Sequence, residues 1–371
     1  MTSTAARRGW SGTLPDFPWD LLAPHKARAA GHPGGLVDLS VGTPVDPTPP
    51  VVRAALAAAC DAPGYPQTAG TPEFRAAAAG WLHRRHGVTT LDPAAVLPTI
   101  GSKELVALLP TLLRLGPGDR VVLPEVAYPT YEVGVRLAGA EPVRADGTVA
   151  AGPGPVRLVW VNSPANPTGR VLPAGHLRKV VDWARERGAV VASDECYLDF
   201  GWEAAPVSVL HPSVCGPDGP AGIIAVHSLS KRSNLAGYRA GFVAGDPALV
   251  AGLLEVRKHA GLMVPAPVLA AATAAYADDG HVAEQRDRYA RRRAALRPAL
   301  ERAGFTVEHS EAGLYLWATA GEDCWASVDR LAGLGILVAP GEFYGPAGGR
   351  HVRVALTATD ERVAAAADRL A

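Results

Sequence analysis

The chain has 371 residues, and its 36 lysines and arginines balance its 36 aspartates and glutamates, so the formal net charge at pH 7 is zero. This balance argues against nucleic acid or an anionic membrane as a partner. A chain of this length buries roughly three quarters of the surface that it exposes when unfolded, which is enough for one large domain and a smaller companion.

No apolar stretch is long enough to span a bilayer, and the first ten residues carry arginines without the apolar run of a secretory signal. The four cysteines have no paired spacing, and the eleven histidines never adopt the spacing of metal ligands. We therefore expect a soluble, cytoplasmic protein without disulfides and without a bound metal.

Short apolar runs predict strands at 96–100, 120–123, 156–161, 189–192 and 222–227. Between the third and fourth of these, apolar residues recur at helical spacing, at Leu177, Val180, Val181 and Ala184. Gly188 closes this segment, as a glycine at a helix C-terminus does. The succession of strand, helix and strand indicates βαβ units. The predicted fold class is α/β: a large domain with a mostly parallel sheet flanked by helices, plus a smaller α+β domain.

The pattern changes from about residue 268 onward. Arg291, Leu296 and Leu300 belong to a predicted long charged helix, and shorter strands follow at 313–317 and 351–354. We place the boundary between the two domains near Pro265-Ala-Pro267. The predicted division is then 1–40 as an N-terminal segment that joins the small domain, 41–265 as the large domain and 266–371 as the small C-terminal domain.

A lysine beside hydroxyl groups follows the predicted strand at 222–227, in Ser228-Leu-Ser-Lys231. A lysine just past the carboxyl end of a strand can be desolvated, which lowers its pKa and makes its amine a nucleophile. Ser228 and, eight residues beyond the lysine, Arg239 supply a hydroxyl and a planar cation, which suit a phosphate. An amine beside a phosphate site is what pyridoxal phosphate needs; the alternative is a surface lysine in a loop.

Polar residues also follow the two preceding strands. Asn166, in Asn-Pro-Thr-Gly, can donate to a phenolate oxygen on a bound ring, or it can belong to an ordinary turn. Asp194, in Asp-Glu-Cys-Tyr, can pair with a protonated pyridine nitrogen, or it can cap a helix. Tyr197 can hydrogen-bond the oxygen of the same ring.

Two further segments fit a phosphorylated ring. Gly101, Ser102 and Lys103 open a predicted helix, where free backbone amides and the helix dipole favour a phosphate. Tyr128, in Tyr-Pro-Thr-Tyr131, can stack on the ring, although an aromatic residue in a proline-rich loop is usually a packing residue.

These motifs, G-S-K, Y-P-x-Y, N-P-T-G, D-E-x-Y, S-x-S-K and G-x-R in this order, resemble those of the class I/II aminotransferases, pyridoxal-phosphate enzymes of the aspartate aminotransferase fold. The likeness runs from Val41-Gly-Thr-Pro to Arg353, and so makes 41–265 the cofactor-binding domain. It implies that Lys231 carries pyridoxal 5′-phosphate, Asp194 pairs with the ring nitrogen and Tyr128 stacks on the ring. It assigns the ring oxygen to Asn166 and Tyr197. It assigns the phosphate to Gly101, Ser102, Lys103 (through its backbone), Ser228 and Arg239.

The resemblance also implies a substrate site and a partner. Arg353 matches the arginine that binds the substrate α-carboxylate, to which Gly42 and Asn166 would contribute. Tyr65 matches a tyrosine that reaches the phosphate in the neighbouring subunit, which implies a homodimer. The substrates would be amino acids and 2-oxo acids, with no nucleic acid or membrane partner.

Within the family, the chain most resembles actinobacterial N-succinyl-diaminopimelate aminotransferases, which act in lysine biosynthesis. We expect glutamate as donor and N-succinyl-2-amino-6-oxopimelate as acceptor. Either a movable side chain or the N-terminal segment around Phe17 and Trp19 should close over the substrate. Arg257, Lys258 and His259 are candidate contacts for the succinyl tail, but a solvated helix face is the simpler interpretation of them. Other specificities (aspartate, prephenate or aromatic), a carbon–sulfur β-lyase and a non-catalytic binding module are the alternatives.

Overall fold

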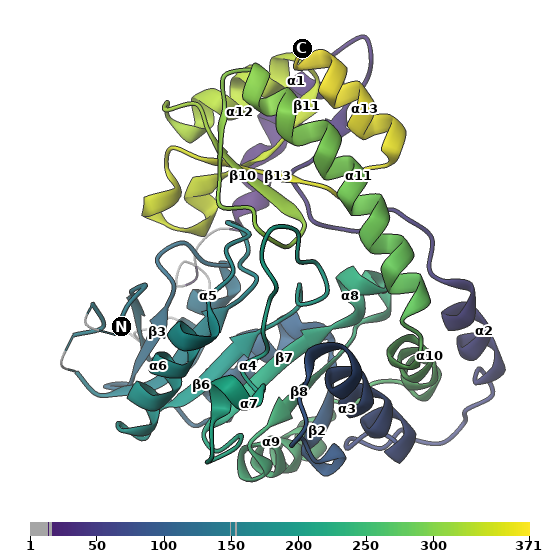
Figure 1. Cartoon of the computed structure of the whole chain (residues 1–371), viewed down its shortest axis with the longest axis vertical. Helices are drawn as coiled ribbons and strands as arrows, with labels where there is room; N and C mark the ends of the chain where they lie inside the picture. The colour runs from purple at the N-terminus through teal and green to yellow at the C-terminus, as the bar shows by residue number, and fades with distance from the viewer. Residues whose placement is uncertain (1–13, 15–16, 149, 153) are drawn as a thin grey trace, which may run out of the picture.

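The computed structural model describes residues 14, 17–148, 150–152 and 154–371. Its centre is a seven-stranded sheet in the order β2-β8-β7-β6-β5-β3-β4. Only β8 runs antiparallel to its neighbours, so the mostly parallel sheet and the α/β class are confirmed (Figure 1). The strands are β2 (Val96–Ile100), β3 (Arg120–Leu123), β4 (Glu141–Arg144), β5 (Val156–Asn162), β6 (Val190–Asp194), β7 (Ile223–Ser228) and β8 (Ala240–Gly245).

Helices cover both faces of this sheet because its strands are apolar on both sides; all six residues of β7, for example, are buried. The helices are α2 (Pro50–Ala58), α3 (Pro72–His86), α4 (Gly101–Leu112), α5 (Thr130–Leu137), α6 (Ala174–Arg185), α7 (Pro212–Cys215), α8 (Leu229–Arg232), α9 (Pro247–Ala260) and α10 (Ala266–Ala277). In α6 the buried residues are the four that the sequence pattern singled out. Gly188 has φ +63° and the next amide donates to Ala184 O, so this glycine closes the helix as predicted.

A second group of elements forms the upper part of Figure 1 around a four-stranded antiparallel sheet, β12-β13-β10-β9. Strand β1 (Val37–Asp38) pairs in parallel with β11, so the N-terminal segment lies with the C-terminal part of the chain. The other elements are α1 (Ala23–Ala30), α11 (Gly280–Arg302), β9 (Thr306–Glu308), β10 (Tyr315–Thr319), α12 (Cys324–Gly333), β11 (Ile336–Leu337), β12 (Ala339–Pro340), β13 (Val352–Ala355) and α13 (Asp360–Arg369). Short 3₁₀ helices lie at Pro18–Leu22, Pro93–Ala95, Ala236–Tyr238, Gly341–Tyr344 and Pro346–Gly348.

The predicted domain boundary at residue 265 assigns α10 to the small domain, but this helix packs with the large one. Its buried residues Leu269, Ala272 and Tyr276 join the core that contains Phe74 and Trp81 of α3. Helix α10 therefore belongs with the large sheet, because it packs against α2, α3 and β8. We propose that the large domain extends through α10 and that the long helix α11 leads from it to the smaller sheet (Figure 1).

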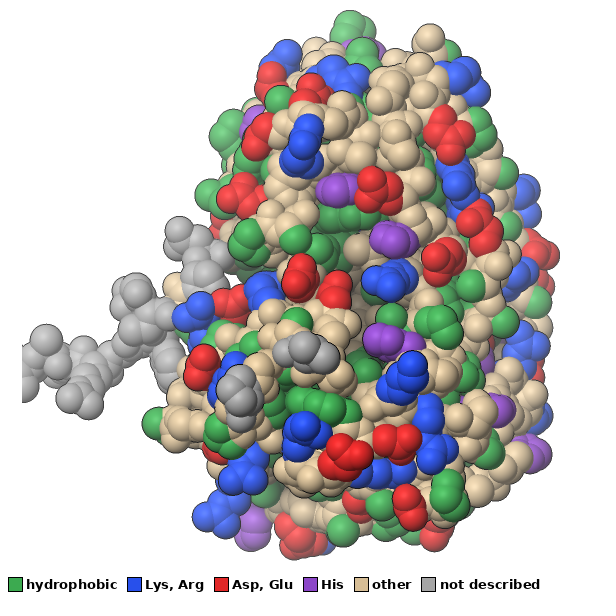
Figure 2. Space-filling view, turned by 60° about the vertical axis from the view of Figure 1, so that its left-hand side comes forward, with side chains coloured by type: hydrophobic (Ala, Val, Ile, Leu, Met, Phe, Trp, Pro, Cys, Tyr) green, Lys and Arg blue, Asp and Glu red, His purple; other side chains and the backbone are tan. Residues whose placement is uncertain are grey.

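The surface reflects the balanced composition. Acidic and basic side chains are interspersed over the face shown in Figure 2, without a broad field of one sign. Across the described ranges, we find no helix whose length and hydropathy would let it cross a membrane.

Candidate active site

A cavity of about 650 Å³ opens at the carboxyl ends of β5, β6 and β7. Parallel strands place their carboxyl ends at one edge of a sheet, which is where ligands bind in open α/β sheets. The predicted site residues that line the cavity are Gly42, Ser102, Lys103, Tyr128, Asn166, Asp194, Tyr197, Ser228, Lys231, Arg239 and Arg353. Gly101 borders it beneath Arg239. Tyr65 does not line it; its side chain is 96% exposed.

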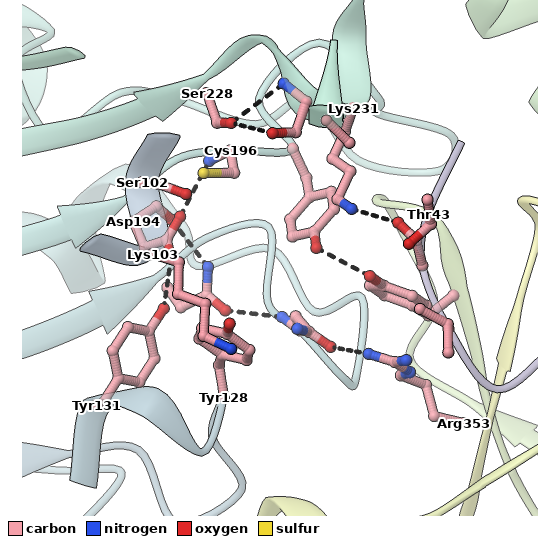
Figure 3. Close-up of a pocket in the computed structure, with 18 of the residues that line it drawn as sticks. Thr43, Ser102, Lys103, Tyr128, Tyr131, Asp194, Cys196, Ser228, Lys231 and Arg353 are labelled. Carbon is pink, nitrogen blue, oxygen red and sulfur yellow. Dashed lines mark hydrogen bonds between the residues drawn. The ribbon is translucent and has the colours of Figure 1, made fainter. Parts of the chain in front are cut away.

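Lys231 lies on the single turn α8, directly after β7. Ser228 begins this turn, and its Oγ accepts a hydrogen bond from Ser230 N at 3.1 Å. The lysine side chain crosses the cavity, and its Nζ donates to the carbonyl oxygen of Gly42 (Figure 3). Burial lowers the pKa of Lys231 below its usual value. More of its amine is therefore neutral at physiological pH than in a solvated lysine.

Asp194 ends β6 and is held from two sides. Tyr131 OH donates to Oδ2 at 2.8 Å and Cys196 N donates to Oδ1 at 3.2 Å (Figure 3). The ring of Tyr131 stacks on Trp160 at a centroid distance of 4.8 Å, which fixes the direction of its hydroxyl. Burial raises the pKa of Asp194, so a cationic group of a bound ligand would stabilise its ionised form. Asp194 is the last residue of β6 and caps a turn; it does not begin a helix.

Stacking of Tyr128 on the ring stays a prediction, whereas the sequence analysis missed the contact that Tyr131, the second tyrosine of the same Y-P-x-Y motif, makes with Asp194. Tyr128 is deeply set in the cavity wall, and burial raises its pKa to about 12. Its ring packs edge-on against Tyr131 at 5.8 Å. One motif therefore supplies an aromatic wall and the hydroxyl that orients Asp194.

Tyr315, on β10, is a further lining residue that the sequence analysis did not assign. Its OH lies 3.0 Å from Tyr197 OH, and burial raises the pKa of Tyr197 well above its usual value. A side chain at Gly42 would place its Cβ 2.0 Å from Tyr315 OH, so only glycine fits there. A lone tyrosine between leucines in a strand carries no sequence signal beyond packing.

Arg353 of β13 faces the cavity from the side of the smaller sheet. Its Nη1 donates to Asn166 Oδ1 at 2.9 Å and its Nη2 to Ser40 O at 2.6 Å. Its guanidinium carbon lies 4.0 Å from the ring centroid of Tyr315. The side chain is buried, and within the described residues no carboxylate forms an ion pair with it. Since a buried cation is stabilised by an anion, this geometry suits a ligand carboxylate.

The cavity floor contains groups that suit a phosphate. Gly101 starts α4 with φ +69°, and a Cβ there would lie 2.3 Å from Nη2 of Arg239. The missing side chain lets the guanidinium lie close to the open amides of the helix N-terminus. The hydroxyls of Ser102, Ser228 and Ser230 line the same cavity. These residues fit the phosphate of pyridoxal phosphate.

The interpretation of Arg257, Lys258 and His259 as a solvated helix face is wrong for Arg257. Arg257 has no exposed surface and forms a two-pronged ion pair with Glu104, at 2.8 and 3.1 Å. Lys258 is exposed and pairs with Glu255. None of the three lines the cavity, so they do not contact a substrate tail there.

A lysine of lowered pKa, a buried carboxylate and a phosphate site at the ends of three parallel strands define an enzyme that uses pyridoxal phosphate. The chain belongs to the aminotransferases of class I and II, whose family profile matches residues 35–370. A probable aminotransferase of Mycobacterium tuberculosis is 65% identical over 370 residues, which cover 100% of this chain and 88% of the relative.

Two other relatives bear on specificity. The 4-dedimethylamino-4-oxo-anhydrotetracycline transaminase OxyQ of Streptomyces rimosus is 63% identical over 357 residues, which cover 96% of this chain and 99% of OxyQ. The solved structure of a probable N-succinyldiaminopimelate aminotransferase from Thermus thermophilus has a TM-score of 0.84 and 32% identity, with 95% of this chain and 99% of that one covered. The predicted family, enzyme class and cofactor are thus confirmed.

When bound, pyridoxal phosphate supplies an aldehyde that condenses with amines and a pyridine ring that withdraws electrons from the amino acid. The residues here support that chemistry in separate ways. Lys231 provides an amine that can accept the proton from the substrate Cα. Asp194, oriented by Tyr131, can hold a proton on the ring nitrogen. Arg353 would orient the substrate through its carboxylate.

We predict that Lys231→Ala removes the visible absorption band of the yellow holoenzyme and its sensitivity to borohydride. Transamination should fall by at least about 10²–10⁴-fold, because the variant lacks the group that moves the proton. Absorption spectra and steady-state assays check this. Lys258→Ala, on the exposed side of α9, is the control and should behave like the wild type. Near-normal turnover by Lys231→Ala would contradict the assignment.

We predict that Asp194→Ala weakens cofactor binding and slows proton abstraction, because the ring nitrogen loses the charge that keeps it protonated. Asp194→Glu and Tyr131→Phe should both be milder, since the carboxylate remains. Cofactor titrations and single-turnover rates measure the two effects separately. An unchanged kcat in Asp194→Ala would show that this carboxylate only caps its turn.

Proposed function

We propose that the protein transfers an amino group from glutamate to N-succinyl-2-amino-6-oxopimelate, as in lysine and diaminopimelate biosynthesis. The supporting observation is the charge of the cavity: its described lining has the cations Lys103, Lys231, Arg239 and Arg353 but a single carboxylate, Asp194. Lys231 and Arg239 suit the cofactor, and Arg353 suits the α-carboxylate shared by donor and acceptor. Lys103 is then available to bind a second carboxylate at the far end of the substrate.

The position of Lys103 supports this division. Its Nζ lies 5.5 Å from the ring centroid of Phe17, at the side of the cavity where Phe17 and Trp19 contribute to the lining. Trp19 contacts Phe343 at a centroid distance of 5.5 Å and its Nε1 lies 3.5 Å from Ser40 O. Phe17 and Trp19 thus form one wall of the cavity near Lys103. These two side chains present aromatic rings rather than charged groups to the cavity, so a short acid and a longer succinylated chain can both be accommodated.

A second acceptor is favoured by the likeness to OxyQ, whose name specifies a 4-oxo tetracycline. Phe17 is 54% exposed and packs against Trp19 with the ring centroids 5.6 Å apart and the ring planes tilted by 34°, so the two rings offer an aromatic surface. Such a surface suits a planar polycyclic ketone. A ring ketone of this kind lacks the α-carboxylate of a 2-oxo acid, so the two acceptors make different demands on Arg353.

We predict that Arg353→Lys slows the half-reaction with glutamate by about 10- to 100-fold, since an ammonium cannot replace the two parallel hydrogen bonds of the guanidinium. With N-succinyl-2-amino-6-oxopimelate, the second half-reaction should slow as well. With the tetracyclic ketone, it should not. Single-turnover kinetics of each half-reaction distinguish these outcomes, and Arg350→Lys, on the exposed loop before β13, is the control.

The proposal fails if the wild-type enzyme does not accept the succinylated compound, or if aspartate or an aromatic amino acid reacts much faster than glutamate. The family assignment would then stand without this specificity.

We further propose a homodimer in which Tyr65 reaches the active site of the other subunit. The supporting observation is that Tyr65, Val41, Val45 and Val51 are large hydrophobic side chains that are exposed in the single chain, as residues of a subunit interface are. The prediction is complementation: Lys231→Ala and Tyr65→Ala chains, each impaired alone, should regain activity when refolded together, because a mixed dimer contains one intact site. Mixtures without regained activity, or a monomer in sedimentation experiments, would contradict the shared site.

A further inference from the structure

Arg257 is a charged side chain in a place where charge is costly. It lies in the last turn of α9 and is completely buried. Its Nη1 donates to Glu104 Oε1 at 2.8 Å, and its Nη2 donates to Glu104 Oε2 at 3.1 Å and to Leu262 O at 3.4 Å. A buried ion pair of this geometry contributes little net stability, but it fixes the positions of the groups that it joins. Its location therefore matters more than its strength.

Glu104 lies in the first turn of α4, the helix whose N-terminus borders the phosphate site. Its Oε2 also accepts a hydrogen bond from Ile100 N at 3.3 Å. One carboxylate therefore ties the last residue of β2 to α4 and to α9. The turn that it spans contains Gly101 and Ser102, whose conformation sets where the open amides of the helix point.

The negative charge of Glu104 is unfavourable next to a phosphate site. A carboxylate in the first turn of a helix stabilises the free helix N-terminus, but it repels an anion that binds to the same amides. The guanidinium of Arg257 cancels that charge while both carboxylate oxygens keep their hydrogen bonds. The cavity thus retains the field of the helix N-terminus and of Arg239.

We propose that Glu104 and Arg257 are positioning residues for the cofactor phosphate. Glu104 fixes the β2–α4 turn, and Arg257 holds Glu104 and neutralises it. Neither residue lines the cavity, so both act through the backbone amides and through the local field. This role is independent of which acceptor the enzyme uses.

The test compares two ligands of the cofactor-free enzyme, pyridoxal phosphate and pyridoxal, which differ only in the phosphate. Arg257→Met leaves the carboxylate of Glu104 without its cation, so pyridoxal phosphate should bind about tenfold more weakly or worse. Pyridoxal affinity should change much less. Inorganic phosphate should likewise compete less well against pyridoxal phosphate. Lys258→Met, the exposed neighbour, is the matched control and should leave both affinities unchanged.

Glu104→Gln should have the opposite effect on the affinity for pyridoxal phosphate. It keeps a hydrogen-bond acceptor for Ile100 N, and it leaves the positive charge of Arg257 without a compensating carboxylate. The ratio of pyridoxal phosphate to pyridoxal affinity should hold or rise, even if thermal stability falls. The double variant Glu104→Gln/Arg257→Met should recover most of the affinity that Arg257→Met loses.

A purely structural pair would change both ligands equally, and that result overturns the proposal. So does a double variant as weak as Arg257→Met, or a Glu104→Gln variant that loses phosphate preference. If Arg257→Met does not fold, the ratio measured for Glu104→Gln decides the question alone.

Discussion

The alignment of three strand ends determines where the chemistry of this protein lies. In the large sheet Asn162 is paired with Asp194, and Asp194 with Val226, so β5, β6 and β7 end side by side. A parallel sheet imposes this arrangement, because the loops that follow its strands all begin at the same edge. Residues that are far apart in the sequence therefore become neighbours at this edge. A shift in the pairing of one strand would displace a whole set of site residues.

The buried arginines differ in the groups that compensate their positive charge. Three of the four buried in the described part of the chain pair with carboxylates: Arg232 with Asp199, Arg257 with Glu104, and Arg292 with Asp46 and Asp360. Arg353 alone is held by neutral oxygens and aromatic faces. Desolvation of a guanidinium is tolerated where an anion compensates it. The exception among the four is thus the one that faces the cavity.

The sequence predicted the strands and the residues that follow them, because apolar runs and the motifs at their ends are local signals. It could not predict contributions that depend on the fold. Tyr315 is an ordinary strand residue until β10 lies opposite Gly42. Arg257 belongs to a basic run that resembles a surface face, and only the docking of α9 against α4 buries it. Helix α10 is uniformly apolar and alanine-rich, so its pattern does not show which sheet it covers.

The pairing of β1 with β11 has a consequence for the order in which the protein forms during synthesis. The strands of the large sheet, from β2 to β8, are complete when the ribosome has made two thirds of the chain. The segment around Ser40 and Gly42, made much earlier, must wait for Arg353 and for its partner strand near the C-terminus. Contacts between residues that are so far apart in the sequence form slowly compared with local contacts. A nascent chain can therefore hold the scaffold of the cofactor site long before it can hold a substrate.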